Sequence, residues 1–195
     1  MSELICVTSR TLCRRDFLEQ IRRIAAASPK AILLREKDLP EEAYRALARQ
    51  VMELCQTYHV PCILHTFVTT AVQLRADALH LPLPLLRQMS EAQKAAFSHL
   101  GASCHSVKDA LEAEALGCTY ITAGHIFTTD CKKGLPPRGL PFLQDVCQSV
   151  HIPVYAIGGI NEENYRSAIR AGAAGVCIMS GVMKSKDPAA YVKNF

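Results

Sequence analysis

The sequence contains no run of five or more like charges, and no apolar stretch that approaches about 18 residues. The first absence argues against a nucleic-acid-binding arm, and the second argues against a transmembrane helix. The opening residues also lack the apolar segment of a signal peptide. We therefore expect a cytoplasmic protein that binds neither nucleic acid nor membranes.

The charge that is present is weakly basic and scattered. The net charge is +4 and the pI is about 8.6, a balance that favours the attraction of phosphorylated substrates. With 195 residues, of which 49% are hydrophobic, the chain can bury one sizeable core. We expect a single domain over residues 1–195.

The nine cysteines include no Cys-x-x-Cys pair, the spacing that many zinc and redox sites use. Reduced thiols in a reducing compartment fit this pattern best. Cys131 alone lies on a loop rich in reactive side chains, but the sequence pairs it with no adjacent base. A nucleophilic role for Cys131 therefore has little support.

Short apolar runs rich in β-branched residues recur along the chain. They are residues 4–8, 31–34, 62–65, 78–81, 101–104, 119–123, 154–157 and 175–179. Helical periodicity lies between most of them, as in 41–55 and 107–116. This alternation predicts an α/β fold, a (β/α)8 TIM barrel. The connection 67–76 is short, so we expect a degenerate third helix.

An open doubly wound sheet is the alternative architecture. It predicts a glycine-rich fingerprint after the first strand. The chain reads Thr8-Ser9-Arg10 there, which favours the barrel. In a barrel the ligand binds at the carboxyl ends of the strands, so the residues that follow each strand are the candidates for chemistry.

Glycine and serine follow the last two predicted strands. Gly158 and Gly159 precede Asn161, which we expect to cap a helix, and Ser180 and Gly181 open the next segment. Glycine lets the backbone approach an anion closely, and the N–H groups at a helix start attract negative charge. We expect these residues to bind phosphate; two ordinary turns with positive φ are the alternative.

Two cations follow the second predicted strand. Arg35 and Lys37 flank Glu36, and strand alternation directs both to the same side. They could grip a carboxylate or a phosphate, or they could belong to a solvated rim. Glu36, on the other side, is expected to be structural.

His125 follows Gly124 directly after the sixth predicted strand, close to Thr129 and Lys132. Histidine is the commonest general acid or base, although a lone histidine is often only structural. The polar neighbours favour a catalytic role here. Histidines also end other strands, at His65, His80 and His105, where they could contact substrate or be structural. A zinc site built from the four is an alternative, but no typical zinc-binding spacing is present.

Several motifs resemble one superfamily. Gly-His-Ile-Phe-Thr-Thr-Asp-Cys-Lys-Lys-Gly-Leu at 124–135 resembles the corresponding loop of the thiazole tautomerases called TenI. Leu-Arg-Glu-Lys at 34–37, Gly-Ala-Ser-Cys-His-Ser at 101–106, Ala-Ile-Gly-Gly-Ile at 156–160 and Gly-Ala-Ala-Gly-Val-Cys-Ile-Met-Ser-Gly at 172–181 extend the resemblance over nearly the whole chain. The chain is thereby identified as a member of the thiamine phosphate synthase/TenI superfamily, whose fold is a (β/α)8 barrel.

The resemblance implies a chemistry and a site. TenI enzymes catalyse a 1,3-proton shift that aromatises an exocyclic-alkene carboxythiazole phosphate, without a cofactor, and their Gly-His histidine corresponds to His125. It implies a phosphate site at Gly158, Gly159, Ser180 and Gly181. The other substrate contacts that it implies are Arg35, Ser103 and Lys132; we expect Lys37 and Thr129 to bind the substrate as well.

The synthase branch of the superfamily is the alternative. It joins a pyrimidine diphosphate to a thiazole phosphate and holds Mg²⁺ with an Asn-Asp pair after strand three and an acidic residue after strand four. Here those places read His65-Thr66 and Leu81-Pro82-Leu83-Pro84, side chains that do not coordinate Mg²⁺ as carboxylates do. Lys37 is more typical of the synthases.

A regulatory protein that binds a thiazole phosphate without catalysis is a third hypothesis. The proton-transfer histidine argues against it, because a protein that only binds has no need of that group. Barrels commonly pair, so a homodimer is conceivable, although the sequence contains no diagnostic interface.

Overall fold

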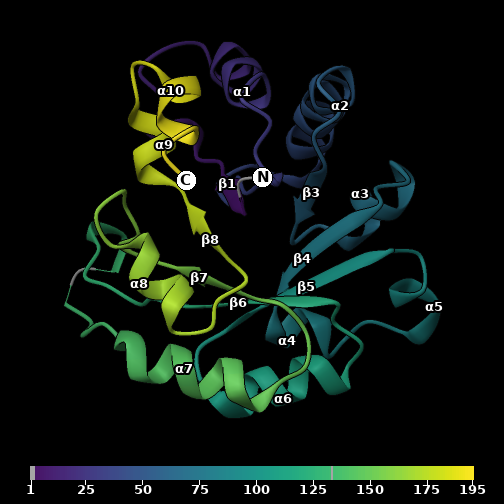
Figure 1. The fold of residues 1–195 in the computed structure, drawn as a ribbon. Helices are drawn as coiled ribbons and strands as arrows, with labels where there is room; N and C mark the ends of the chain where they lie inside the picture. Colours follow the sequence, from purple (N-terminus) through teal and green to yellow (C-terminus); the bar gives the residue numbers. More distant parts are fainter. Residues whose placement is uncertain (1–2, 133) are drawn as a thin grey trace.

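The computed structural model describes residues 3–132 and 134–195, apart from the side chain of Cys131. The hypothesis of a nucleophilic Cys131 concerns that side chain, so it lies outside the described part of the structure. Figure 1 shows the strands at the centre of the molecule with the helices around them. No helix in the described part of the chain is long and apolar enough to cross a membrane.

The strands form a closed, parallel barrel in chain order, which confirms the predicted (β/α)8 fold. Their bounds are β1 Leu4–Val7, β2 Ala31–Leu34, β3 Cys62–His65, β4 Ala78–Pro82, β5 His99–Cys104, β6 Tyr120–Gly124, β7 Val154–Ile157 and β8 Gly175–Ile178. Each agrees with a predicted run to within two residues. The barrel closes where Ile5 of β1 lies opposite Cys177 of β8.

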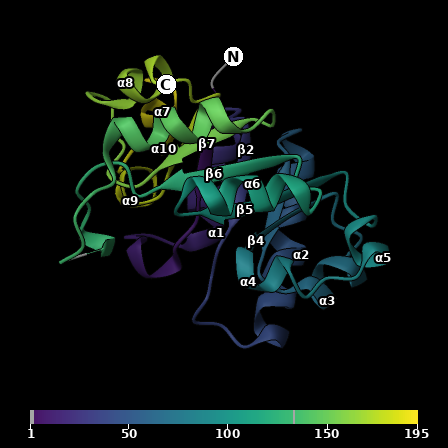
Figure 2. The same ribbon diagram turned by 90° about the horizontal axis from the view of Figure 1, so that it is seen from below.

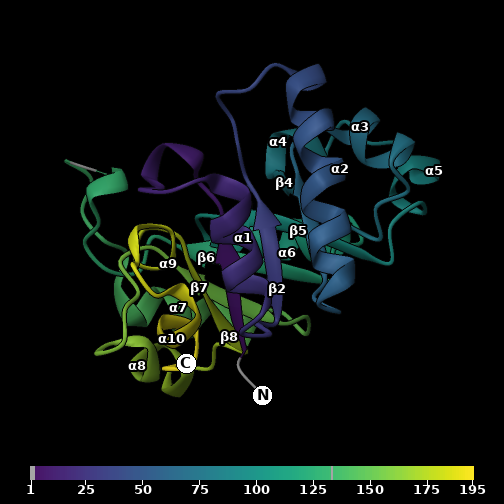
Figure 3. The same ribbon diagram turned by 90° about the horizontal axis from the view of Figure 1, so that it is seen from above.

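Helices cover the outside of the barrel, as the view from below in Figure 2 shows for α6 and α7 and the view from above in Figure 3 shows for α1 and α2. Their bounds are α1 Phe17–Ala25, α2 Glu41–Thr57, α3 Val68–Gln73, α4 Leu83–Leu86, α5 Glu91–Lys94, α6 Val107–Ala115, α7 Gly139–Ser149, α8 Tyr165–Arg170, α9 Ser180–Lys184 and α10 Pro188–Val192. The 3-10 helices are η1 Arg10–Leu12 and η2 Asp130–Lys132.

The shortest helices do not lie where the sequence predicted. The third connection does hold a short helix, α3, but the connection from β4 to β5 is divided further, into α4 and α5. The division has a local cause, because Ser90 starts a new helix by a reciprocal capping box with Gln93. The side chain of each residue bonds the backbone N–H of the other.

The core has two layers, as expected for a barrel. The outer layer packs strands against helices and includes Ile32, Leu64 and Leu100. The inner layer fills the barrel and includes Val7, Ile63 and Tyr120. Gly101 makes room for Tyr120, because a Cβ there would overlap the tyrosine ring.

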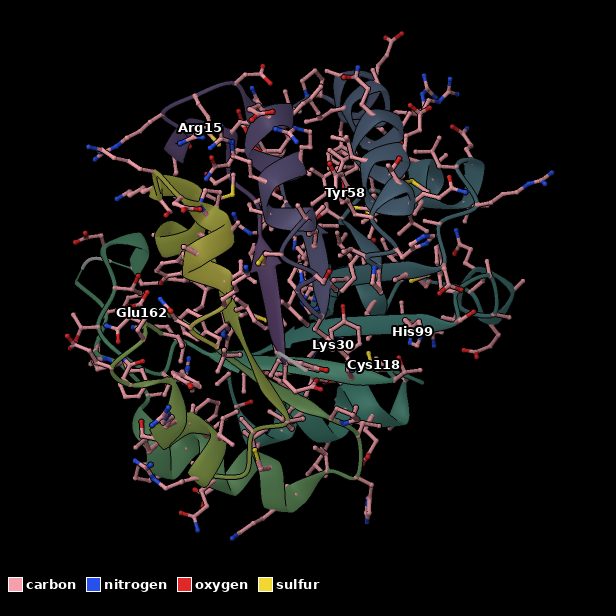
Figure 4. The ribbon with its side chains drawn as sticks, turned by 45° about the horizontal axis from the view of Figure 1, so that its top comes forward. Arg15, Lys30, Tyr58, His99, Cys118 and Glu162 are labelled. Carbon is pink, nitrogen blue, oxygen red and sulfur yellow. The ribbon has the colours of Figure 1, made fainter. Side chains whose placement is uncertain are left out.

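The two ends of the barrel differ in character. Lys30, His99 and Cys118, labelled in Figure 4, lie at the end where strands begin. The polar residues singled out in the sequence lie at the opposite end, where strands finish. This is the end at which barrels of this type build their active sites.

Candidate active site

A cavity of about 480 Å³ lies at the carboxyl end of the barrel. This volume suits a small-molecule ligand. The structure brings all the predicted site residues together in the cavity wall: Arg35, Lys37, Ser103, His125, Thr129, Lys132, Gly158, Gly159, Ser180 and Gly181. His65 and His105, weighed as substrate contacts, line it as well.

The wall of the cavity carries a group of cations. Partial burial lowers the pKa of Lys37, and the nearby charges of Arg35 and Lys132 lower it further. Three cations, from the segment after β2 and from the loop after β6, therefore line the same cavity. Such a cluster favours a ligand with more than one negative charge.

Glu36 holds the end of β2 in place from the other side. It is buried, and its carboxylate accepts hydrogen bonds from the Thr8 hydroxyl at 2.6 Å and the Arg10 N–H at 2.9 Å. Its neighbours Arg35 and Lys37 line the cavity. The predicted structural role of Glu36 fits these contacts.

His125 lies directly after β6, with 9% of its surface exposed, and lines the cavity. Its Nε2 is 3.3 Å from the Leu135 carbonyl oxygen. A carbonyl only accepts, so Nε2 carries a proton in this contact, and in the neutral ring the lone pair is then on Nδ1. The imidazole is therefore held in the tautomer in which Nδ1 can act as a base.

Gly158 and Gly159 fit the backbone of β7 against the loop that carries His125. Their φ values are +98° and +69°, in the region that favours glycine. A Cβ at Gly158 would overlap the side chain of His125 and lie 2.8 Å from its Cα, and one at Gly159 would lie 2.5 Å from the Thr128 oxygen. Their predicted contact with phosphate stays a prediction, but this packing alone requires glycine.

The helix after these glycines starts later than predicted. Asn161 does not cap it; its side chain accepts the N–H groups of Glu163 and Asn164 in a local turn. Helix α8 begins only at Tyr165, after Asn164. Asparagine competes for nearby backbone donors in turns as readily as at helix caps, which explains the error.

A buried polar layer lies below the cavity. His80 Nε2 is 2.9 Å from the Ser103 hydroxyl, and His80 Nδ1 is 3.1 Å from the Tyr120 hydroxyl. His65 stacks beside His80, with ring centroids 5.9 Å apart. Burial, and then the charges of nearby groups, lower the pKa of His65 to about 2. Burial, and then the charges of Lys37 and Arg35, lower the pKa of His80 to about 3. Both rings are neutral at neutral pH, and His80 fixes Ser103 in the wall.

These two histidines should make the protein sensitive to mild acid. Below about pH 6.5 the unfolded chain protonates both, whereas the folded protein keeps them neutral until its pKa values of about 2 and 3. In this window each should lower the free energy of unfolding by about 1.4 kcal/mol per pH unit as the pH falls. Urea unfolding between about pH 7 and pH 5 measures the slope. His80→Gln should reduce the dependence of the free energy of unfolding on pH by the contribution of one histidine. An unchanged dependence would contradict this account.

The family is decided by comparison with known proteins. The family model described as thiamine monophosphate synthase, TMP-TENI, matches residues 4–182. The chain belongs to this family. The superfamily resemblance seen in the motifs is thereby confirmed.

Relatives in the TMP-TENI family match along most of their length. A thiamine-phosphate synthase of Clostridium novyi (strain NT) is 31% identical over 192 residues, covering 95% of this chain and 92% of the relative. Thiamine-phosphate synthase 2 of Streptococcus pneumoniae serotype 4 is 34% identical over 185 residues, covering 92% and 86%. The structure of thiamine phosphate pyrophosphorylase from Pyrococcus furiosus superposes with a TM-score of 0.85 at 28% identity, covering 98% and 92%. The first two are named thiamine-phosphate synthases, and the third a thiamine phosphate pyrophosphorylase.

The residues of this TMP-TENI chain fit Mg²⁺ poorly. His65 and Thr66 stand at one of the places where the resemblance puts metal ligands in synthases, and the Thr66 hydroxyl is 2.5 Å from His65 Nδ1. The carboxylate in the cavity wall, Asp109, accepts the N–H of His105 at 2.8 Å. Glu36 is occupied by its own hydrogen bonds. Mg²⁺ prefers carboxylate oxygens in octahedral array, and these side chains do not supply it.

The four histidines weighed as zinc ligands are engaged separately. His65 contacts Thr66, His80 contacts Ser103 and Tyr120, and the rings of His105 and His125 contact backbone carbonyls. Within residues 3–132 and 134–195, no group of three or more histidine, cysteine or acidic side chains is arranged to hold a metal ion.

Some residues of the cavity wall escaped the sequence reasoning. Apolar and weakly polar contributors include Pro82, Leu83, Thr122, Ile157 and Met179. Thr122 lies within β6, whereas the other four lie at or just after the ends of β4, β7 and β8, a position that could have identified them. A search for charged and polar groups does not find the apolar ones among them, because apolar residues at strand ends are also typical of the hydrophobic core.

Proposed function

We propose that this member of the TMP-TENI family is a thiazole tautomerase that acts without a metal ion. The observation that carries the proposal is His125, held with a basic nitrogen in the wall of a cationic cavity. A proton shift between two carbon atoms needs a group that can accept a proton from one carbon and deliver one to the other. Histidine is suited to this near neutral pH.

The substrate class that the TenI resemblance implies suits the charges of the cavity. A carboxythiazole ethyl phosphate carries a phosphate at one end and a carboxylate at the other. In our proposal the backbone and hydroxyl groups at Gly158, Gly159, Ser180 and Gly181 bind the phosphate. Arg35 and Lys132 then offset the carboxylate, with Ser103 and Thr129 beside the ring.

In the proposed reaction Nδ1 of His125 removes the proton from the ring carbon that bears the carboxylate. The electron pair moves through the ring toward the exocyclic alkene, and the protonated histidine delivers a proton to the exocyclic carbon. One C–H bond breaks, another forms, and the ring becomes aromatic with no change in composition. Negative charge that develops toward the carboxylate during the first step is stabilised by the cations that follow β2 and β6.

The aromatisation rate tests this proposal. The exocyclic-alkene carboxythiazole phosphate is supplied to the purified protein in the presence of EDTA, and product is followed by chromatography. We expect turnover that EDTA leaves unchanged. Conversion no faster than in buffer would overturn the tautomerase assignment.

Thiamine phosphate synthase is the second candidate, and the names of the relatives favour it. The same protein is therefore supplied with a pyrimidine diphosphate, a thiazole phosphate and Mg²⁺, and pyrophosphate is measured. Because His65 and Thr66 stand where carboxyl and amide ligands are expected, we predict no release above the background. Mg²⁺-dependent release of pyrophosphate would replace our first proposal with the synthase. Binding of the thiazole phosphate without either reaction would favour the third hypothesis, a regulatory protein that binds this ligand without catalysis.

A further inference from the structure

The peptide that precedes the imidazole of His125 is held by two side chains from different parts of the fold. The carbonyl oxygen of Gly124 is 2.8 Å from Nδ1 of His105, which follows β5. The same oxygen accepts the Nε–H of Arg138, which precedes α7, at 3.1 Å. A carbonyl has two lone pairs, and this one receives a donor on each.

The contact also defines the state of His105. Because the Gly124 oxygen can only accept, Nδ1 of His105 carries a proton, and in the neutral ring the lone pair is then on Nε2. His105 is an exposed residue of the cavity wall. One of its nitrogens is therefore committed to the backbone beside His125.

His105 is itself held from behind. The backbone N–H of His105 donates to Asp109 Oδ2 at 2.8 Å, and the backbone N–H of Asp109 donates to the Ser106 hydroxyl at 3.0 Å. Ser106 caps α6 in this way. The start of helix α6 therefore fixes the backbone from which His105 reaches Gly124.

His125 depends on such support, because the contact that sets its tautomer is long and does little to fix the position of the ring. The contact from Nε2 to Leu135 is 3.3 Å, at the long end for a hydrogen bond. On the backbone, the His125 carbonyl accepts the N–H of Arg138 at 3.0 Å, and the Ile126 N–H donates to Ile157. The position of the ring thus depends on how firmly this backbone is held.

We propose that His105 is a positioning residue for His125, acting through the carbonyl of Gly124. This inference rests on the proposed function, in which His125 transfers the proton. Loss of the donor frees the Gly124 peptide on one side, and a shift of about 1 Å in a catalytic group can cost about 10²-fold in rate. His105 takes no part in the proton transfer itself.

Two substitutions separate positioning from chemistry. The amide nitrogen of asparagine is as many bonds from Cα as Nδ1 of histidine, so His105→Asn keeps a donor for Gly124 and loses Nε2. His105→Leu loses both. We expect kcat to fall by about 10- to 100-fold in His105→Leu with KM changed less than about threefold, and to recover to within about threefold of the unmodified protein in His105→Asn. His99→Asn, at the other end of β5, is the control.

A second readout is independent of activity. Long-range ¹H–¹⁵N NMR spectra report the tautomer and surroundings of each histidine ring. The His125 signals should move in His105→Leu and stay in place in His105→Asn and in the His99 control. If this pattern appears in a protein that lacks tautomerase activity, the positioning role stands and the proposed function fails.

Two results would overturn the positioning role. If His105→Leu keeps both the normal kcat and the His125 signals, the Gly124 contact is dispensable. If His105→Asn loses as much kcat as His105→Leu while the His125 signals stay in place, Nε2 of His105 acts directly on the substrate.

Discussion

His125→Ala is expected to lower kcat of the proposed tautomerase by about 10² to 10⁴-fold, the usual cost of removing a general acid–base group. The ring lines the cavity, but the proposed phosphate contacts lie directly after β7 and at the start of α9. Affinity for the aromatic product should therefore change by less than about threefold. Steady-state kinetics and calorimetric titration with the product measure the two effects.

The control for this substitution is His99→Ala, which removes an exposed imidazole where β5 begins. It should leave both kcat and product affinity unchanged. Near-normal kcat in His125→Ala would show that another group moves the proton. Loss of product affinity as large as the loss of kcat would instead make His125 a binding contact.

Gly158→Ala is expected to have the second largest effect on activity, because it strains the backbone and displaces His125. The added Cβ meets the His125 side chain and its Cα, at a φ of +98°. Strain of this kind costs about 1 to 3 kcal/mol, and displacement of His125 should lower kcat by about 10²-fold. Urea unfolding and steady-state kinetics check the two parts.

Gly117→Ala is a matched control for this second prediction. Gly117 has a φ of +91°, close to that of Gly158, yet a Cβ there has no neighbour within 4 Å among the described residues. It should cost about 1 kcal/mol in stability and leave kcat unchanged. If Gly158→Ala behaves like Gly117→Ala in both measurements, the packing of β7 against His125 does not matter for activity.

The barrel could be predicted because its strands are short apolar runs separated by helical periodicity. The site could be located because a barrel places the residues after its strands around one cavity. Arg35, His125 and Gly158 lie far apart in the sequence, and each was found from its position after a strand. The expected alternation of side chains in the segment directly after β2 also separated Glu36 from the two cations.

Other features depend on contacts that the sequence does not encode locally. The partner of the His125 ring is the carbonyl of Leu135, and any residue could supply a carbonyl there. His105 reaches Gly124 because β5 and β6 are neighbours in the barrel, with Cys104 opposite Ala123. The role of Asn161 was mispredicted because its side chain found donors within its own turn.

The proton shift itself gives the most direct test of the central claim. The exocyclic-alkene carboxythiazole phosphate is incubated with the protein in deuterated water that contains EDTA, and ¹H NMR follows the product. We predict rapid aromatisation with deuterium at the former exocyclic carbon, and neither in His125→Ala. Aromatisation at the uncatalysed rate, or activity that requires Mg²⁺ and releases pyrophosphate, would contradict the assignment.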